Sequence, residues 1–234
     1  MAGLYIHIPF CESRCIYCGF YSTTSLKLRD DYTDALCREM QMRPAKAALG
    51  SNETIETIYL GGGTPSQLNG SHLNQIFSAI RKNYTLAENM EITMECNPDD
   101  VTGDFCETLK QLPINRISMG AQTFCNERLR FLHRRHNAGE VEEAVTRLRN
   151  IGIRNISIDL MFGFPEESLL QSGSRSTHAS ASCLSLPPSV LPGGKYIHLH
   201  ARSRYTHKWY QYQVCLKALS RSGTVFPRQV SLRI

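Results

Sequence analysis

The sequence predicts an α/β fold in which short strands alternate with helices over residues 1–167. Strand-like runs of six or seven residues recur five times, and turn-forming Gly, Pro or Asn residues close most of them. Segments of helical periodicity follow the strands. This alternation favours a parallel sheet with crossover helices, closed either as an open doubly wound sheet or as a partial or complete (β/α) barrel.

The strands are predicted from apolar and β-branched runs and from the turns that end them. The first run leads directly into a cysteine-rich loop. The second stops at the glycine-rich run Gly61–Pro65, the third at Asn97-Pro98, and the last at Gly163–Pro165. In chain order, the five predicted strands are Leu4–Pro9, Thr54–Leu60, Met90–Glu95, Asn115–Gly120 and Ile156–Phe162.

The helices are predicted from apolar residues at helical spacing between these strands. In the last of them, Val141, Ala144, Val145 and Leu148 fall on one face. In chain order, the predicted helices are Asp30–Met42, Ser71–Asn83, Asp104–Gln111, Asn126–Leu132 and Gly139–Asn150.

Charge divides the chain near residue 167. Residues 1–167 contain 17 Lys and Arg against 21 Asp and Glu, whereas residues 168–234 contain nine Lys and Arg and no acidic residue. A basic segment can bind nucleic acid or membrane. However, acidic residues and periodicity disappear at one point, which a shifted reading frame would produce. We therefore predict an incomplete α/β barrel domain over residues 1–167 and a basic Ser/Pro-rich tail over residues 168–234 that is non-native from about Leu169, or disordered.

Composition is that of a soluble globular protein, with 41% hydrophobic residues. No apolar run approaches the roughly 18 residues of a membrane helix, and Met1-Ala2-Gly3 leads into a strand without a secretory signal. We expect a cytoplasmic protein with at most peripheral membrane contact and no nucleic-acid partner. Scattered cysteines are expected to be small buried hydrophobes, namely Cys37, Cys96, Cys106 and Cys125.

Three further cysteines, Cys11, Cys15 and Cys18, lie within eight residues in a C-x3-C-x2-C pattern. Cysteine thiolates hold iron–sulfur clusters, four of them when ligation is complete. Three can hold three irons of a [4Fe–4S] cluster and leave the fourth iron open to another ligand. The spacing therefore predicts a cluster that serves as a reaction centre.

Two other uses of the trio, a zinc site and a disulfide, are disfavoured. A zinc site would require a fourth Cys or His, and usually a second C-x2-C pair, which is missing here. His7 is near but belongs to the first strand, where it either packs or hydrogen-bonds near the cluster. A disulfide would require an oxidising compartment. The cluster is the favoured reading.

The run YIHIPFCxxxCxYC resembles the start of radical S-adenosylmethionine (SAM) proteins of the coproporphyrinogen III oxidase family, and within it the HemW-type haem chaperones. The resemblance implies a partial (β/α) barrel, of which five strands are legible here. It also implies that SAM chelates the open iron and is cleaved to a 5′-deoxyadenosyl radical by an electron from the cluster.

The resemblance also implies a set of SAM contacts at strand ends. The run GGGTP supplies three of them, and we expected its free N–H groups to meet a carboxylate. The others come from the runs MECNP, RISMGAQTF, LHRRHN and IDLMFGFP and from the first strand; Arg134 rather than Arg135 aligns with the family's arginine. The predicted contacts are Tyr5, Gly62, Gly63, Thr64, Glu95, Gln122, Arg134 and Asp159.

Phe20 stands where the oxidase branch carries a fourth cysteine. This difference favours a haem chaperone, which would bind haem and deliver it to an acceptor protein, with an electron donor for the cluster. Two alternatives remain: an oxygen-independent oxidase acting on coproporphyrinogen III, and a fragment without activity. Whether the chain is an enzyme is left open. The family's haem-binding motif is not recognisable, and His207–Tyr210 is only a loose match.

Overall fold

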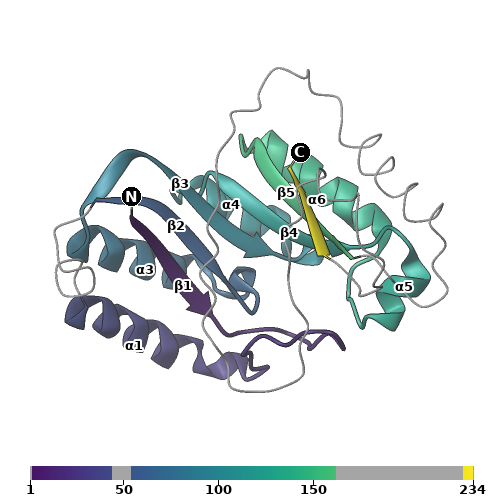
Figure 1. The fold of residues 1–234 in the computed structure, drawn as a ribbon, viewed down its shortest axis with the longest axis horizontal. Coiled ribbons are helices and arrows are strands. Elements are labelled where there is room, and N and C mark those ends of the chain that lie inside the picture. The colour runs from purple at the N-terminus through teal and green to yellow at the C-terminus, as the bar shows by residue number, and fades with distance from the viewer. Residues whose placement is uncertain (1, 44–53, 162–228, 234) are drawn as a thin grey trace, which may run out of the picture. The chain divides into compact units, whose positions relative to one another are not determined.

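The computed structural model describes residues 2–43, 54–161 and 229–233 (Figure 1). The strands are β1 (Ala2–Ile8), β2 (Ile55–Gly62), β3 (Leu86–Cys96), β4 (Arg116–Gln122), β5 (Asn155–Met161) and β6 (Gln229–Arg233). The α-helices are α1 (Arg29–Met42), α3 (Gly70–Asn83), α4 (Gly103–Lys110), α5 (Asn126–Phe131) and α6 (Ala138–Asn150). Short 3-10 helices are η1 (Leu26–Leu28), η2 (Pro65–Gln67) and η3 (Pro98–Asp100).

The strands form one sheet in the order β1-β2-β3-β4-β5-β6, and each neighbouring pair from β1 to β5 is parallel. The predicted α/β class and parallel sheet are therefore confirmed. Sequential parallel order with a helix between strands is the arrangement of a partial (β/α) barrel.

All five predicted strands and all five predicted helices are present, with ends displaced by a few residues. The largest displacement is in β3, which begins at Leu86 instead of Met90. The prediction did not include β6, which lies at the end of the basic segment. Apart from β6, the predicted tail of residues 168–234 lies outside the described residues, and its non-native or disordered character stays a prediction.

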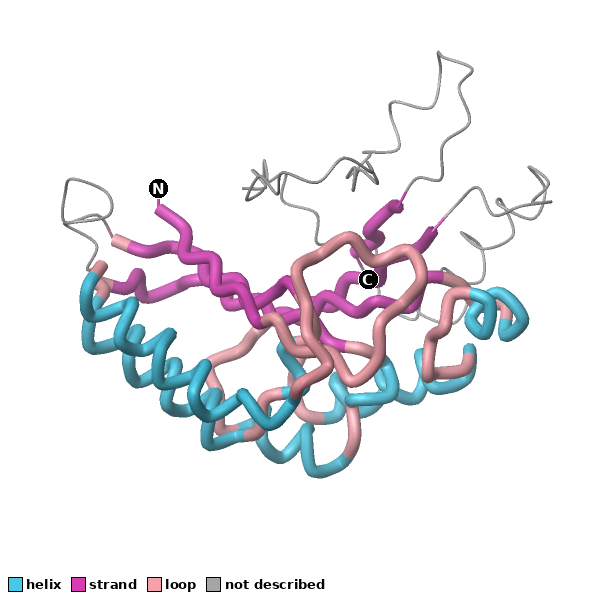
Figure 2. Tube along the Cα trace, turned by 90° about the horizontal axis from the view of Figure 1, so that it is seen from below, coloured by secondary structure: helices cyan, strands magenta, loops and turns pink. Residues whose placement is uncertain are grey.

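The helices of the described part lie along one face of the sheet (Figure 2). Side chains alternate along each strand, so one set of residues meets these helices. This set is apolar and almost fully buried: Ile6, Ile8, Ile58, Leu60, Ile92, Met94, Ile117, Met119, Ile156 and Ile158. The apolar face is the core that holds the strands in register.

Side-chain caps fix where three of the helices begin. Asn69 caps α3 by accepting from the His72 N–H, Thr102 caps α4, and Asn137 caps α6 through the N–H groups of Gly139 and Glu140. A cap satisfies N–H groups that have no partner within the helix. The loops that precede these helices are thereby fixed at their helical ends.

Within the described ranges, no helix is both long and apolar enough to cross a membrane. The chain also divides into two compact units, and residues 1–160 with 231–234 form the unit that contains every predicted site residue.

Candidate functional site

The predicted contacts gather where the parallel strands end. Tyr5 belongs to β1, Gly62 ends β2, Glu95 lies near the end of β3, Gln122 ends β4, and Asp159 lies near the end of β5. The carboxyl ends of parallel strands meet at one edge of the sheet, which is where (β/α) barrels build their active sites. The fold thus brings together residues that span more than 150 positions of the sequence.

The cysteine loop is tied to this edge. The Cys11 N–H donates to the Thr23 carbonyl at 3.0 Å, and the Thr23 N–H donates to the Pro9 carbonyl at 2.7 Å. The Thr64 hydroxyl donates to Cys11 Sγ at 3.5 Å, and Arg134 Nη1 donates to Cys15 Sγ at 3.5 Å. Donors of this kind stabilise thiolates, the form of cysteine that binds metals.

The three thiols of the loop influence one another. All three are free, and burial, together with the nearby Cys11 and Cys15 thiols, raises the pKa of Cys18. A positive partner such as iron would favour the thiolate form of Cys18. No group of three potential ligands among the described residues gathers as it would around a single metal ion. A cluster does not require such convergence, because each cysteine binds a different iron.

The glycine turn after β2 differs from expectation, because its N–H groups are not free. The Gly62 N–H donates to Glu95 Oε2 at 3.1 Å, the Gly63 N–H to the Ile8 carbonyl at 2.8 Å, and the Thr64 N–H to the Phe10 carbonyl at 2.7 Å. The expectation that these groups wait for a ligand carboxylate is wrong. They hold the start of the cysteine loop and orient Glu95.

The second and third glycines of the turn cannot carry a side chain. Gly62 has a φ of 111°, and a Cβ there would lie 2.4 Å from the His7 ring. A Cβ on Gly63 would lie 2.7 Å from the Ile8 carbonyl oxygen and 2.8 Å from that of Phe10. Backbone atoms cannot yield as side chains can, so Gly63 is what lets the turn approach the cysteine loop.

Gln122 is strained and incompletely bonded. It has a φ of 66°, a left-handed conformation that is uncommon for a residue other than glycine. The residue is 5% exposed, and its Oε1 has no hydrogen-bond partner among the described atoms. A buried amide oxygen without a partner is costly, and strain of this kind gathers at functional sites. Gln122 therefore offers an acceptor for a ligand donor.

The two adjacent arginines face different neighbours. Arg134 donates to Cys15, to Asn97 Oδ1 at 2.7 Å and to the Gly120 carbonyl. Arg135 instead pairs with Glu12 and, at 2.6 and 2.7 Å, with Asp99 and Asp100 of η3. Arg134 is thus the arginine at the strand ends, in line with its assignment from the motif.

Tyr5 and Asp159 complete the set. The Tyr5 hydroxyl lies 3.2 Å from His7 Nδ1, and partial burial together with the Glu95 carboxylate raises the pKa of Tyr5 to about 12. His7 Nε2 lies 2.9 Å from the Tyr21 carbonyl oxygen, so this histidine joins β1 to the cysteine loop. Asp159 is half-buried, and its charge adds to burial and to the effect of Glu95 in raising the pKa of Tyr59.

Sequence reasoning missed two residues of this edge. Asn97 was noted only as part of the turn after the third strand, yet its side chain accepts from Arg134 and donates to the Thr64 hydroxyl at 3.5 Å. Tyr59 was taken only as part of a strand, although its hydroxyl donates to Glu95 Oε1 at 2.6 Å. No local signal in the sequence marks Tyr59, because the space beside Gly61 that admits this contact is visible only in the structure.

The charged and polar groups at this edge suit a ligand such as SAM, which carries both positive and negative charges. Glu95 and Asp159 provide negative charge, Arg134 provides positive charge, and Gln122 presents an acceptor without a partner. These groups fit SAM, which carries an ammonium, a sulfonium and a carboxylate. The individual contacts stay predictions.

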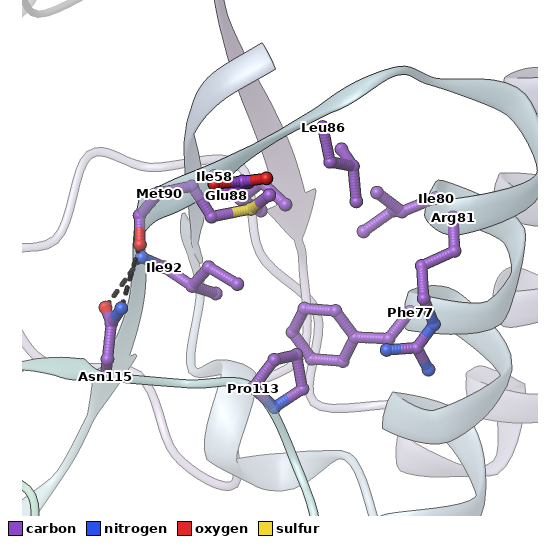
Figure 3. A pocket seen from close by; sticks show the side chains of 10 residues that line it. All are labelled: Ile58, Phe77, Ile80, Arg81, Leu86, Glu88, Met90, Ile92, Pro113 and Asn115. Carbon is purple, nitrogen blue, oxygen red and sulfur yellow. Dashed lines mark hydrogen bonds between the residues drawn. The ribbon is translucent and has the colours of Figure 1, made fainter. Parts of the chain in front are cut away.

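A cavity lies away from this edge. Its volume is about 290 Å³, and it lies near the start of β3 and just before β4. Figure 3 shows the side chains that line it. Its lining is largely apolar, with Phe77, Ile80, Leu86, Met90 and Ile92 around it. None of the predicted site residues lines this cavity, so it is not the candidate site.

Comparisons with known proteins agree with this geometry. Residues 5–171 match the radical SAM superfamily. The chain is 38% identical over 170 residues to the haem chaperone HemW of Escherichia coli and 38% identical over 172 residues to that of Bacillus subtilis. These matches cover 71% and 72% of this chain but only 44% of each relative.

Among solved structures, coproporphyrinogen III oxidase (HemN) from Escherichia coli, described as a radical SAM enzyme, superposes with a TM-score of 0.69 and 29% identity. The match covers 77% of this chain and 41% of that one. Membership of this superfamily implies a [4Fe–4S] cluster and SAM. The chain belongs to the radical SAM superfamily and is HemW-like within its coproporphyrinogen oxidase family.

Proposed function

We propose that this chain is the radical SAM core of a haem chaperone, which binds haem and transfers it to an acceptor protein. The observation that carries the proposal is the 38% identity to relatives named haem chaperones, over 170 and 172 residues. The chain spans less than half the length of those relatives, so haem binding by this chain requires its own test.

In this proposal Cys11, Cys15 and Cys18 each bind one iron, and the fourth iron takes SAM. A bound cluster supplies the electron that can cleave the SAM sulfonium. Arg134 and Thr64 stabilise the thiolates of Cys15 and Cys11 through the contacts described above. Such charge-assisted hydrogen bonds are stronger than neutral ones.

The ligand side of the site is assigned by charge. Glu95 and Asp159 face the cationic part of SAM, and Gln122 accepts from one of its donors. Tyr5, Gly62 and Gly63 shape the space around it. The turn contributes through its close packing on the cysteine loop, since its N–H groups already have partners.

Phe20 favours the chaperone over the oxidase. This exposed side chain lies two residues after Cys18, where the oxidase branch carries a further cysteine. The alternative function is oxygen-independent oxidation of coproporphyrinogen III. The structural similarity to HemN supports this alternative. A fragment without activity is the third outcome. Residues His207–Tyr210, weighed as a haem motif, lie outside the described residues.

The partners follow from the proposal. A haem chaperone requires haem, an acceptor protein and, if SAM is cleaved, an electron donor for the cluster. We propose a cytoplasmic location with at most peripheral membrane contact and no nucleic-acid partner.

The proposal is tested on the anaerobically reconstituted chain by titration with haem, followed by transfer to apo-myoglobin as a surrogate acceptor. Saturable haem binding and transfer, without CO2 release from coproporphyrinogen III, are expected. CO2 release with SAM and reductant would assign the oxidase instead. Binding of about four irons per chain, without haem binding or CO2 release, would assign the inactive fragment.

A further inference from the structure

Glu95 is held by strand β2 through both of its carboxylate oxygens. The Tyr59 hydroxyl donates to Oε1 at 2.6 Å, and the Gly62 N–H donates to Oε2 at 3.1 Å. Tyr59 and Gly62 lie three residues apart on the strand that precedes the glycine turn. A carboxylate bonded at both oxygens has one orientation, so its position is set before any ligand arrives.

Gly61 is the residue that allows this contact. A Cβ at Gly61 would lie 2.6 Å from Tyr59 Cε1 and 3.0 Å from Glu95 Cδ. Gly61 does not have the positive φ that Gly62 has, so space rather than backbone conformation requires glycine here. The first glycine of the GGGTP run thus has a role that the predicted SAM contacts did not include.

The Tyr59 ring is itself supported. Tyr5 stacks on it with ring centroids 6.0 Å apart and an interplanar angle of 24°. Burial, followed by the negative charge of Glu95, raises the pKa of Tyr59 well above its ordinary value. The phenol is therefore protonated at neutral pH and can donate to Glu95.

We propose that Tyr59 is a positioning residue for SAM binding: it acts through Glu95, by fixing the carboxylate that faces the cationic part of the ligand. A phenol suits this task because it orients a carboxylate and leaves its negative charge in place. An arginine or lysine would neutralise that charge. Fixing a binding group in advance reduces the entropy that binding costs. The inference rests on the proposed role of Glu95 in SAM binding.

The test measures SAM dissociation constants by anaerobic equilibrium dialysis of the cluster-loaded full chain. Four proteins are compared: the parent, Tyr59→Phe, Glu95→Gln and the double variant. We expect Tyr59→Phe to weaken binding about tenfold, with unchanged iron content, since one charge-assisted hydrogen bond has about this effect. Glu95→Gln should weaken it further, and the double variant should match Glu95→Gln alone.

Two controls separate positioning from general damage. Tyr84→Phe also removes a phenol hydrogen bond, but to the Arg43 carbonyl, away from the strand ends, and should leave SAM affinity unchanged. Gly61→Ala should weaken SAM binding at least as much as Tyr59→Phe. Gly103→Ala, where a Cβ meets nothing within 4 Å, should not weaken it.

Unchanged affinity in Tyr59→Phe would overturn the inference, and so would losses that add fully in the double variant, because Tyr59 would then act independently of Glu95. If the parent chain binds no SAM, the proposed function fails first. The contact between Tyr59 and Glu95 is then tested by the free energies of unfolding of the same four proteins in urea. A coupling free energy of zero between Tyr59 and Glu95 would remove the inference as well.

Discussion

The two faces of the sheet use the same strands for different purposes. Toward the helices, alternate residues are apolar and almost fully buried, as at Leu60 and Ile117. On the opposite face, the strands carry Tyr59, Thr93 and Arg116. Closed barrels usually fill their interior with branched apolar side chains. Here the face toward the helices carries the apolar core, and the opposite face is polar.

The polar face also shows how its charges are accommodated. Arg116 is buried and donates to the Thr93 hydroxyl at 3.1 Å and to Ser157 Oγ at 3.2 Å, with Glu91 at 3.6 Å. A buried charge is tolerated when it is paired and hydrogen-bonded. Thr93 and Arg116 thus form a hydrogen-bonded polar group on the strands beside Tyr59. The two faces should therefore respond differently to mutation.

The largest difference is expected at the cysteine loop. Cys15→Ala should abolish the cluster while changing the unfolding free energy of the metal-free chain by less than about 0.5 kcal/mol, because Cys15 is outside the packed core. Iron content after anaerobic reconstitution measures the effect, with Cys125→Ala as the control. Normal iron content in Cys15→Ala would refute the ligand assignment.

On the apolar face, a truncation should cost stability. Leu60→Ala should lower the free energy of unfolding by about 2–5 kcal/mol, through lost burial and a cavity. Ser157→Ala, on the polar face, should cost about 1 kcal/mol through lost hydrogen bonds. Urea denaturation measures the free energy of unfolding of both variants. Equal losses in Leu60→Ala and Ser157→Ala would contradict the distinction between the two faces.

The pH dependence of stability should reveal His136, which is buried behind the site. Burial, and then the charge of Arg134, lowers the pKa of His136 from 6.5 to about 4. Its Nε2 lies 3.1 Å from the Ala121 carbonyl oxygen, consistent with a neutral imidazole that donates there. Asp99 is 4.0 Å from Nδ1, beyond hydrogen-bonding distance, and does not restore the charge.

Between pH 4 and pH 6.5, His136 binds a proton in the unfolded chain but not in the folded chain. The contribution of neutral His136 to the free energy of unfolding is therefore complete above pH 6.5 and is lost as the pH falls toward 4. The expected loss is about 3 kcal/mol. Urea titrations across this range measure it, and His136→Asn should flatten the slope. An equal slope in the variant would exclude His136 as its source.

The smallest effect is expected at Arg135, which clamps the cysteine loop to η3. Its side chain is 28% exposed, so Arg135→Gln should cost only about 0.5–1 kcal/mol of global stability. The loop should open more often, and trypsin should cleave faster after the exposed Arg14. Arg43→Gln, which removes the surface pair with Glu39, is the control. Identical cleavage rates in both variants would rule out the clamp.

The strands β1 to β5 and the five α-helices could be predicted because each carries a local pattern, whereas β6 in the basic segment could not. The strand-end location of Glu95, Gln122 and Asp159 followed from that pattern and from family motifs. The bonding of the glycine turn could not be read in the same way. Its partners Ile8 and Phe10 are more than 50 residues away in the chain, and only the parallel register of β1 and β2 brings them together.

The left-handed backbone of Gln122 was equally hidden, because no local signal marks a non-glycine residue for positive φ. Tyr59 was hidden for a different reason. A tyrosine in a strand is ordinary, and only the space left by Gly61 makes it a partner of Glu95. Contacts between strands, rather than the strands themselves, were the unpredictable part.

The central claim is that the polar strand-end face binds SAM at a cluster held by three cysteines. Electron paramagnetic resonance of the reduced, reconstituted chain tests it directly, because a ligand on the open iron alters the cluster signal. The account predicts a signal that changes on SAM addition in the parent chain and changes much less in Glu95→Gln. A cluster signal that SAM leaves unchanged in the parent chain would contradict the account.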